Sequence, residues 1–253
     1  MQTIKEITEL RKFLRNERLN GKTIGFVPTM GALHEGHLAL ARRCQSENDV
    51  TVVSIFVNPT QFNDPADLKN YPVILREDTI KLVSTGVDYL FLPEYETIYP
   101  DKFTFYIDET DLSKELCGIS RPGHFRGVLT VVMKLLNIVG ADRAYFGEKD
   151  YQQYRLINGM IEAFFMETAI IPVPTVREES GLALSSRNSL LDEDSRKRAP
   201  LFFGILSSSE SCSEARMRLQ ENGFFVDYVT DIGNRRFGAV ILGGIRLIDN
   251  VQI

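Results

Sequence analysis

The chain has 253 residues, of which 43% are hydrophobic and 25% are charged, and its formal net charge is −5. These proportions are ordinary for a globular protein and allow one large domain or two smaller ones. The negative charge and the lack of a long basic run argue against nucleic acid as the main partner, and no apolar run is long enough to span a membrane.

The three cysteines, Cys44, Cys117 and Cys212, are widely separated and odd in number. They indicate neither a disulfide framework nor a cysteine-based zinc site. The first residues of the chain lack the apolar core of a signal peptide. We therefore expect a cytoplasmic protein in a reducing compartment.

The first part of the chain predicts alternating strands and helices. Apolar residues at helical spacing predict an amphipathic helix over residues 3–19. An apolar strand over 23–27 should break at Pro28, and a helix should run from Leu38 to about Glu47. The unalternating apolar run 50–57 is typical of a parallel strand covered on both faces. Strand, helix and strand together predict a right-handed βαβ unit.

Further along, the pattern predicts helices over 74–85, 128–139 and 151–165, and strands over 87–92, 143–146 and 170–176. Residues 94–126 should be irregular, with a short β stretch at 103–107. The pattern of predicted elements then changes, with helices over 192–207 and 213–221 and antiparallel strands over 224–231 and 239–248. This change places a domain boundary near residues 177–179.

The residues between the first strand and its helix form the strongest candidate site. They place His34-x-Gly36-His37 at the start of a helix. Gly36 has no Cβ, so a flat ligand can approach the backbone there. The unpaired N–H groups of a first helical turn favour a phosphate. The pattern indicates a site for a nucleotide polyphosphate, and the alternative is a pair of surface histidines.

A second strand-to-helix corner carries Gly147, Glu148, Lys149 and Asp150. Lys149 can donate to a phosphate as a point charge. Asp150 could hold a ribose hydroxyl, although capping the helix is the simpler interpretation. The remaining histidine, His124, lies in the basic stretch 121–127, and the alternative there is a solvated loop.

A polar loop holds Ser185, Ser186 and Arg187, whose hydroxyls and guanidinium suit phosphate oxygens. A mobile loop of this kind can close over a triphosphate. Gln61 and Gln153 could orient a hydroxy acid, although an ordinary surface or core amide is the usual interpretation of a single glutamine. Glu77 and Asp78 open a helix and are explained more simply by the helix dipole than by a Mg²⁺ site.

Five motifs occur together in one order along the chain. They are FVPTMG-x-LH-x-GH at residues 26–37, SIFVNP-x-QF at 54–62, SRPGHFRGV at 120–128, FGEKD-x-QQ at 146–153 and LSSRN at 184–188. The sequence RLIDN at 246–250 also matches. The set closely resembles the pantoate–β-alanine ligase family, and it is far more specific than a lone H-x-G-H.

The resemblance implies an α/β fold with a Rossmann-like parallel sheet at residues 1–176, which would bind nucleotide and pantoate. A small α+β lid domain would occupy residues 177–253. ATP and pantoate would give pantoyl adenylate and pyrophosphate, and β-alanine would then displace AMP to give pantothenate. Mg²⁺ would accompany the triphosphate, and the protein would be a homodimer through its first domain.

The resemblance also assigns roles by position. The catalytic group would comprise His34, His37, Lys149, Ser185, Ser186 and Arg187. Gln61 and Gln153 would hold pantoate, and Gln61 would also contact β-alanine. The metal ligands stay open. The full set expected to contact ATP is Met30, Gly31, Ala32, Leu33, His34, Glu35, Gly36, His37, Gly147, Glu148, Lys149, Asp150, Val176, Leu184, Ser185, Ser186 and Arg187.

Two departures from the family pattern stand out. The segment 207–236 looks shorter than usual, which predicts a trimmed second domain, and Val73 stands where an arginine is common. Two other functions stay open on the residues alone. One is a nucleotidylyltransferase that acts on a phosphate acceptor, which would want more arginine near the acceptor. The other is a nucleotide-sensing module without catalysis, against which the intact histidines, Lys149 and Arg187 argue.

Overall fold

The computed structural model describes residues 1–253, and their packing divides the chain into two compact units. The first unit comprises Met1–Gly147 and Gln152–Val173, and the second comprises Glu148–Tyr151 and Pro174–Ile253. The second unit therefore includes a short strip of chain from the middle of the sequence. The division into domains at 176/177 stays a prediction.

The first unit is built on a six-stranded sheet in the order β1-β4-β3-β2-β5-β6, and every pairing in it is parallel. Its strands are β1 (Gln2–Ile4), β2 (Ile24–Thr29), β3 (Val50–Ile55), β4 (Tyr89–Phe91), β5 (Arg143–Gly147) and β6 (Ala169–Val173). The predicted α/β fold with a parallel sheet is confirmed. β2 pairs with β3 on one side and with β5 on the other, and ligands bind beyond the carboxyl ends of strands at such a switch point.

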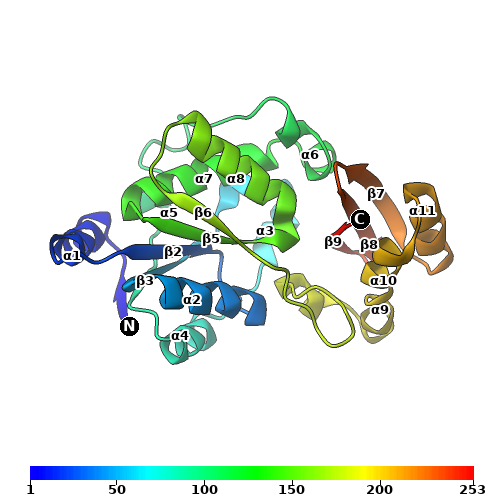
Figure 1. Ribbon diagram of the computed structural model, residues 1–253, viewed down its shortest axis with the longest axis horizontal. Helices are drawn as coiled ribbons and strands as arrows, with labels where there is room; N and C mark the ends of the chain where they lie inside the picture. Colours follow the sequence, from blue (N-terminus) through cyan, green and yellow to red (C-terminus); the bar gives the residue numbers. More distant parts are fainter. The chain divides into compact units, whose positions relative to one another are not determined.

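Helices cover both faces of this sheet. Figure 1 shows α2 (Glu35–Glu47) and α4 (Leu75–Ser84) on one side, and α7 (His124–Val139) and α8 (Tyr151–Ala163) on the other. The other elements of this unit are α1 (Ile7–Leu19), η1 (Pro59–Gln61), α3 (Pro65–Lys69), α5 (Tyr95–Ile98), η2 (Leu112–Lys114) and α6 (Cys117–Ser120). Under α2 and α4, a core forms around Val27, Leu38, Val53 and Leu82, all buried. This core fixes the carboxyl ends of β2 and β3.

The second unit has a three-stranded antiparallel sheet of β7 (Phe225–Ile232), β8 (Arg235–Leu242) and β9 (Ile245–Gln252). Its helices are α9 (Glu193–Arg198), α10 (Leu201–Ser208) and α11 (Cys212–Glu221), with the short turns η3 (Glu148–Asp150) and η4 (Ser186–Leu190). A separate core includes Phe202, Leu206 and Leu219. A Cβ at Gly238 would lie 2.9 Å from Phe202 and 3.0 Å from Leu206, so a glycine there lets α10 pack closely on β8.

Five predictions in the first unit are wrong. Residues 94–126 are not wholly irregular, since they contain α5, η2 and α6. Residues 2–4 form β1, which pairs with β4, and the helix begins only at Ile7. β2 continues through Pro28 to Thr29; its pairing with β5 ends at Phe26, so a residue without an N–H is tolerated there. The histidine helix begins at Glu35 and not at Leu38. Residues 103–107 form no strand, since no strand pairs with them and Ile107 N donates instead to Thr130 Oγ1 at 2.9 Å.

Two predictions in the second unit are also wrong. The helix expected over 192–207 is broken into α9 and α10 near Pro200, because proline cannot continue the hydrogen-bond ladder of a helix. The strand expected over 239–248 is two strands joined by Gly243 and Gly244. Both glycines have positive φ, +56° and +76°, as a tight hairpin turn requires.

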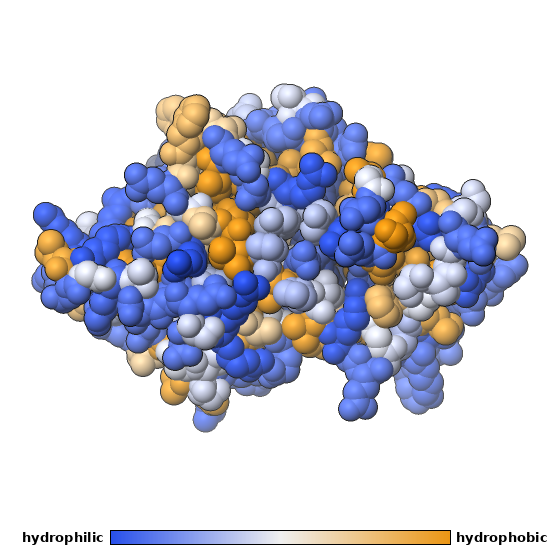
Figure 2. All heavy atoms as spheres, in the orientation of Figure 1, coloured by the Kyte–Doolittle hydropathy of each residue, from blue (hydrophilic) through white to orange (hydrophobic).

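The hydropathy of the surface is mixed. In the view of Figure 2, hydrophilic residues cover most of each unit and the hydrophobic residues that show are scattered. None of the helices combines the length and the apolar character needed to cross a lipid bilayer.

Candidate active site

The corner between β2 and α2 is held by a buried carboxylate. Asp78, only 1% exposed, accepts the backbone N–H of Ala32 at 2.8 Å and that of Leu33 at 2.7 Å. Gly31 and Ala32 both have positive φ, +84° and +51°, which is unfavourable for an alanine and needs external support. Asp78 therefore braces a strained turn, a role different from the dipole compensation expected of it.

The two histidines lie at the amino end of α2. His34 is the residue before the first helical turn, and its Nδ1 accepts the N–H of Gly36 at 3.1 Å. The Nδ1 of His37 accepts the N–H of His34 at 3.4 Å, a long hydrogen bond. The ring centroids are 4.1 Å apart. Because each Nδ1 is an acceptor, each neutral ring carries its proton on Nε2.

The turn after β3 is organised around Asn58, which is buried. Its Oδ1 accepts the hydroxyls of Thr60 at 3.0 Å and of Tyr99 at 2.9 Å. Burial raises the pKa of Tyr99 to about 12, so this hydroxyl keeps its proton and stays a donor. The Nδ2 of Asn58 donates to Gln61 Oε1 at 3.0 Å and to Gly127 O at 3.2 Å. Asn58 thus orients the side chain of Gln61 from within the fold.

The backbone of Gln61 is held by the last histidine. His124 Nδ1 lies 2.8 Å from Gln61 O, and His124 Nε2 lies 3.0 Å from Arg121 Nη1. A carbonyl can only accept, so Nδ1 is the protonated nitrogen and Nε2 accepts from the guanidinium. His124 is 8% exposed, so the alternative of a solvated loop is wrong for this residue. It positions the turn that carries Gln61.

The two glutamines at the start of α8 have different surroundings. Gln152 is buried; its Nε2 donates to Leu112 O and to Glu115 O, both at 2.8 Å, and its Oε1 accepts Cys117 N at 3.1 Å. Its amide is fully used within the protein. Gln153 is half-buried, and it is the one of the pair expected at the substrate.

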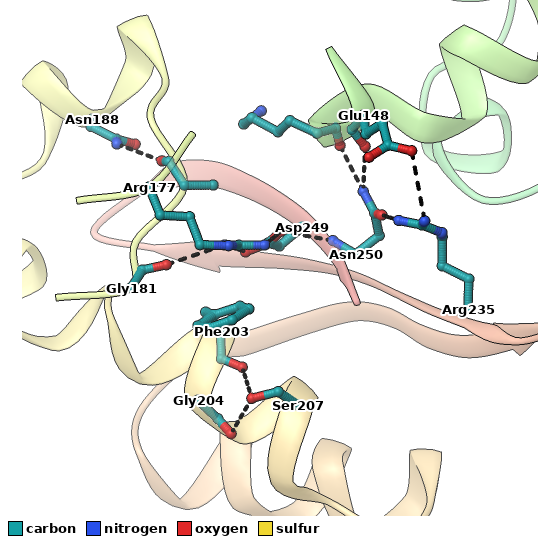
Figure 3. Close-up of polar contacts among 12 residues, drawn as sticks. Glu148, Arg177, Gly181, Asn188, Phe203, Gly204, Ser207, Arg235, Asp249 and Asn250 are labelled. Atoms are coloured by element: carbon teal, nitrogen blue, oxygen red, sulfur yellow. Dashed lines mark hydrogen bonds and ion pairs between the residues drawn. The ribbon is translucent and has the colours of Figure 1, made fainter. Parts of the chain in front are cut away.

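The second unit carries the other two predicted segments. Glu148, Lys149 and Asp150 form η3 directly after β5, and Lys149 Nζ lies 3.9 Å from Asp150 Oδ2. The carbonyls of Glu148 and Lys149 both accept the side-chain amide of Asn250, at 2.9 and 3.0 Å (Figure 3). This turn is therefore anchored to β9 through its backbone, which leaves the lysine side chain to point elsewhere.

The serine–arginine segment forms η4. Ser185 caps it by accepting the N–H of Arg187 at 3.3 Å, and Asn188 N donates to Ser185 O at 3.0 Å. Asn188 Nδ2 also donates to Ala183 O at 3.0 Å, while Leu184 N donates to Val176 O at 3.0 Å. The segment is closed on itself and presents Ser186 and Arg187 at its first turn.

The chain supplies no cage for a metal. No group of three or more histidine, cysteine, aspartate or glutamate side chains is arranged to hold an ion. Both oxygens of Asp78 accept backbone N–H groups. Mg²⁺ commonly binds through one or two carboxylates and the phosphates of its substrate, so this donor set fits an ion that the nucleotide brings with it.

Comparison with known proteins defines the family. The model of the family described as pantoate-beta-alanine ligase matches residues 2–252. This chain belongs to the pantoate–β-alanine ligase family. The resemblance drawn from the motifs is confirmed.

Individual pantoate–β-alanine ligases are similar over nearly the whole chain. A pantothenate synthetase of Bdellovibrio bacteriovorus is 52% identical over 252 residues, which cover 100% of this chain and 99% of the relative. The crystal structure of the Francisella tularensis pantoate-beta-alanine ligase, complexed with beta-gamma ATP and beta-alanine, is 44% identical with a TM-score of 0.94, covering 100% of this chain and 97% of that one. A pantothenate synthetase structure from Thermus thermophilus is 39% identical with a TM-score of 0.93, covering 100% of this chain and 99% of that one.

The chain is an enzyme of the ligase class that binds ATP. It condenses pantoate with β-alanine to pantothenate in an ATP-dependent reaction. The length of the Bdellovibrio relative is matched almost fully, although the prediction that segment 207–236 is trimmed relative to other members is not tested by this.

The motifs missed several residues that hold the site together. Asp78 was assigned to its own helix, yet its partners Ala32 and Leu33 lie across the unit. Asn58 was part of a quoted motif without a role. Asp249 and Asn250 matched the family pattern, and nothing in their spacing indicated which segments they contact. Only burial and long-range hydrogen bonds reveal these roles.

Proposed function

We propose that the triphosphate of ATP binds against His34, His37 and the first turn of α2, with Lys149, Ser185, Ser186 and Arg187 as further donors. The observation that carries this proposal is the acceptor role of Nδ1 in both histidines, which leaves Nε2–H as the donor of each neutral ring. The rest of the proposed ATP contacts are residues 30–37, 147–150, 176 and 184–187.

The proposed chemistry relies on charge stabilisation more than on a strong base. A carboxylate oxygen of pantoate attacks the α-phosphorus, and the bond to the bridging oxygen of pyrophosphate breaks. Negative charge grows on the phosphate oxygens, where positioned donors lower the barrier. His37 stabilises the departing pyrophosphate. The amine of β-alanine then attacks the acyl carbon, AMP leaves, and the amine loses a proton.

We assign Gln61 and Gln153 to pantoate, and Gln61 also to β-alanine. In support, Gln61 Oε1 is oriented by Asn58, and Gln61 Nε2 lies 3.2 Å from the sulfur of Met30. A thioether is a weak acceptor, so exchanging it for a substrate carboxylate or hydroxyl is favourable. The half-buried Gln153 would complete a pocket for a small polar acid.

We assign Mg²⁺ to the phosphates of the bound nucleotide, where it would supply neutralising charge. We also propose a cytoplasmic homodimer that associates through the first unit. The exposed apolar side chains of that unit, such as Phe105 and Ile119, support an association surface. The sedimentation coefficient of the wild-type protein, compared with that of Phe105→Asp, tests the dimer; a monomeric wild type would rule it out.

The site assignment is tested through two separate assays. The overall reaction is followed by AMP release with pantoate, β-alanine, ATP and Mg²⁺, and the first step by pantoate-dependent exchange of pyrophosphate into ATP without β-alanine. We expect both activities in the wild type. The proposal fails if variants of Gln61 change only the affinity for ATP, or if variants of the histidines change only the affinity for pantoate.

A further inference from the structure

The carboxyl-terminal strand β9 holds two segments that are far apart in the sequence. The first is the hairpin that precedes Leu184. Arg177 Nη1 and Nη2 donate to Asp249 Oδ2 and Oδ1 at 2.6 and 2.8 Å, and Nη1 also donates to Gly181 O at 3.1 Å. The guanidinium carbon lies 3.7 Å from the ring centre of Phe203. Figure 3 shows Arg177 extended toward Asp249, with Gly181 beside it and the ring of Phe203 below the guanidinium.

This contact fixes the base of the serine–arginine segment. Arg177 pairs with Ala183 in an antiparallel bridge, and Glu178 N donates to Leu182 O at 2.9 Å, so residues 177–183 form a closed turn. Asp249 is only 4% exposed, and a bidentate pair of this kind sets both distance and orientation. The position at which the chain enters Leu184 therefore depends on Asp249.

The second held segment is the turn that carries Lys149. The next residue of β9, Asn250, donates both amide hydrogens to the carbonyls of Glu148 and Lys149 and is also 4% exposed. Its Oδ1 accepts from Arg235, whose guanidinium lies 3.9 Å from the ring centre of Tyr151 and 3.9 Å from Glu148 Oε1. Figure 3 shows this chain of contacts running from Arg235 through Asn250 to Glu148.

The strand between the two held segments is itself fixed. Asp249 and Asn250 pair with Gly238 and Phe237 of β8 in register, and Asp249 Oδ1 also accepts the N–H of Asn250 at 2.8 Å. Consecutive residues of a strand point to opposite faces. One rigid dipeptide therefore reaches two segments that approach it from different directions.

We infer that Asp249 and Asn250 are positioning residues that set the spacing between Lys149 and the Ser185–Arg187 donors. They touch no substrate themselves; they act through the backbone of one segment and through Arg177 of the other. The inference rests on the proposed assignment of those donors to ATP. A displacement of about 1 Å in such donors lowers a rate by about 100-fold.

The test is a set of double-mutant cycles read by the pantoate-dependent pyrophosphate exchange. Asp249→Asn keeps the shape of the side chain and removes its charge, and Asn250→Ala removes both donated hydrogen bonds. We expect each to lower the exchange rate about 10-fold to 100-fold with the KM for pantoate unchanged. In an Arg187→Ala background, the loss caused by Asp249→Asn should be several-fold smaller than in the wild type, because one of the donors that it positions is already gone. Asn250→Ala should behave in the same way in a Lys149→Ala background.

The matched control is Asp227→Asn. Asp227 of β7 accepts two guanidinium nitrogens of Arg246, at 2.9 and 3.2 Å, and both donors belong to β9 itself, not to a segment of the proposed site. The pyrophosphate exchange rate of the Asp227→Asn variant should stay within about 2-fold of the wild-type rate. Arg177→Lys breaks the same bidentate pair from the more exposed side and replaces Asp249→Asn in the cycle if that variant does not fold.

The possible results distinguish failure of the positioning role of Asp249 and Asn250 from failure of the proposed ATP contacts. Equal losses in the wild-type and donor-deleted backgrounds, or no loss in the single variants, would overturn the positioning role. If Arg187→Ala and Lys149→Ala themselves retain full exchange activity, the assignment of the donors to ATP fails instead.

Discussion

Two backbone N–H groups decide the chemistry that His34 and His37 can offer. By donating to Nδ1 of each ring, they fix which nitrogen carries the proton in the neutral form. A histidine in this state is a hydrogen-bond donor at Nε2 without any need for protonation. His124 has the opposite tautomer, because its Nδ1 must carry a proton to donate to a backbone carbonyl.

We predict that His37→Ala and Lys149→Ala each lower kcat by well over 10-fold. One lost donor to a developing phosphate charge costs roughly 3 kcal/mol of transition-state stabilisation. The measurement is AMP release under saturating substrates. Lys197→Ala serves as the control, since Lys197 forms a surface pair with Glu193 and should leave the rate unchanged. Near-wild-type rates in both active-site variants would remove the proposed donors.

We predict that Asp78→Asn weakens both the fold and the site. The amide cannot accept at both positions, so at least one of the N–H groups of Ala32 and Leu33 loses its partner, at a cost of about 1–3 kcal/mol. Thermal unfolding and kcat/KM for ATP measure the two effects. The neighbouring Glu77 is exposed, so Glu77→Gln should change neither quantity. An Asp78→Asn protein as stable as the wild type would contradict the bracing role.

At the scale of elements, α7 packs closely against η1 because Gly127, at their contact, has no side chain. A Cβ on Gly127 would lie 2.4 Å from the carbonyl oxygen of Thr60 and 2.7 Å from Gln61 N. This close approach also brings Gly127 O within reach of Asn58. The helix therefore sets the position of the turn that carries Gln61.

We predict that Gly127→Ala is destabilising and raises the KM for pantoate. The added methyl must push α7 away from η1, which costs about 1–3 kcal/mol as an overpacked contact. Gly159 of α8 has no atom within 4 Å of a built Cβ, so Gly159→Ala should instead add about 0.5–1 kcal/mol from helix propensity. Chemical denaturation of both variants gives the comparison. If the two variants were equally stable, the contact between α7 and η1 would be able to accommodate the added methyl group without strain.

Elements with strong internal patterns were predictable, and those defined by a distant partner were not. The unalternating apolar run of β3 and the helical spacing of apolar residues in α7 identified both elements from local sequence. β1 is three residues long and exists because it pairs with β4, which lies far along the chain. The same limit explains the site: H-x-G-H is local, whereas the contacts of Asp78 and Asn250 join residues that no window contains.

At the scale of the whole molecule, acid stability depends on an ion pair in the second unit between a buried arginine and a partly exposed aspartate. Arg236 is 2% exposed; its Nε and Nη2 donate to Asp231 at 2.8 and 3.0 Å, and Nη1 donates to Ser209 O. The hydrogen bond from Arg236 lowers the pKa of Asp231. A carboxyl with a lowered folded-state pKa stabilises the fold above its unfolded value of about 3.9, and this contribution is lost as the pH falls further.

We predict that Asp231→Asn lowers the unfolding free energy at pH 7 by roughly 1–3 kcal/mol and reduces the loss of stability on acidification. Urea unfolding at pH 7 and at about pH 3.5 measures both effects in wild type and variant. Some acid sensitivity should persist, because Asp101 also has a lowered pKa, through its pair with Lys134. An unchanged difference between the two pH values would show that Asp231 does not titrate with unfolding.

The short segment Glu148–Tyr151 limits how the protein can be divided into separately folding fragments. Because these residues pack with the second unit although they precede the final strand of the first, the chain crosses between the units three times. A fragment that starts at Pro174 would keep its own core but leave Asn250 and Arg235 facing missing partners. If the protein were expressed as two fragments divided at this point, residues 148–151 would have to be added back to the second fragment as a separate peptide. The dissociation constant of that peptide would measure how strongly β9 binds this segment.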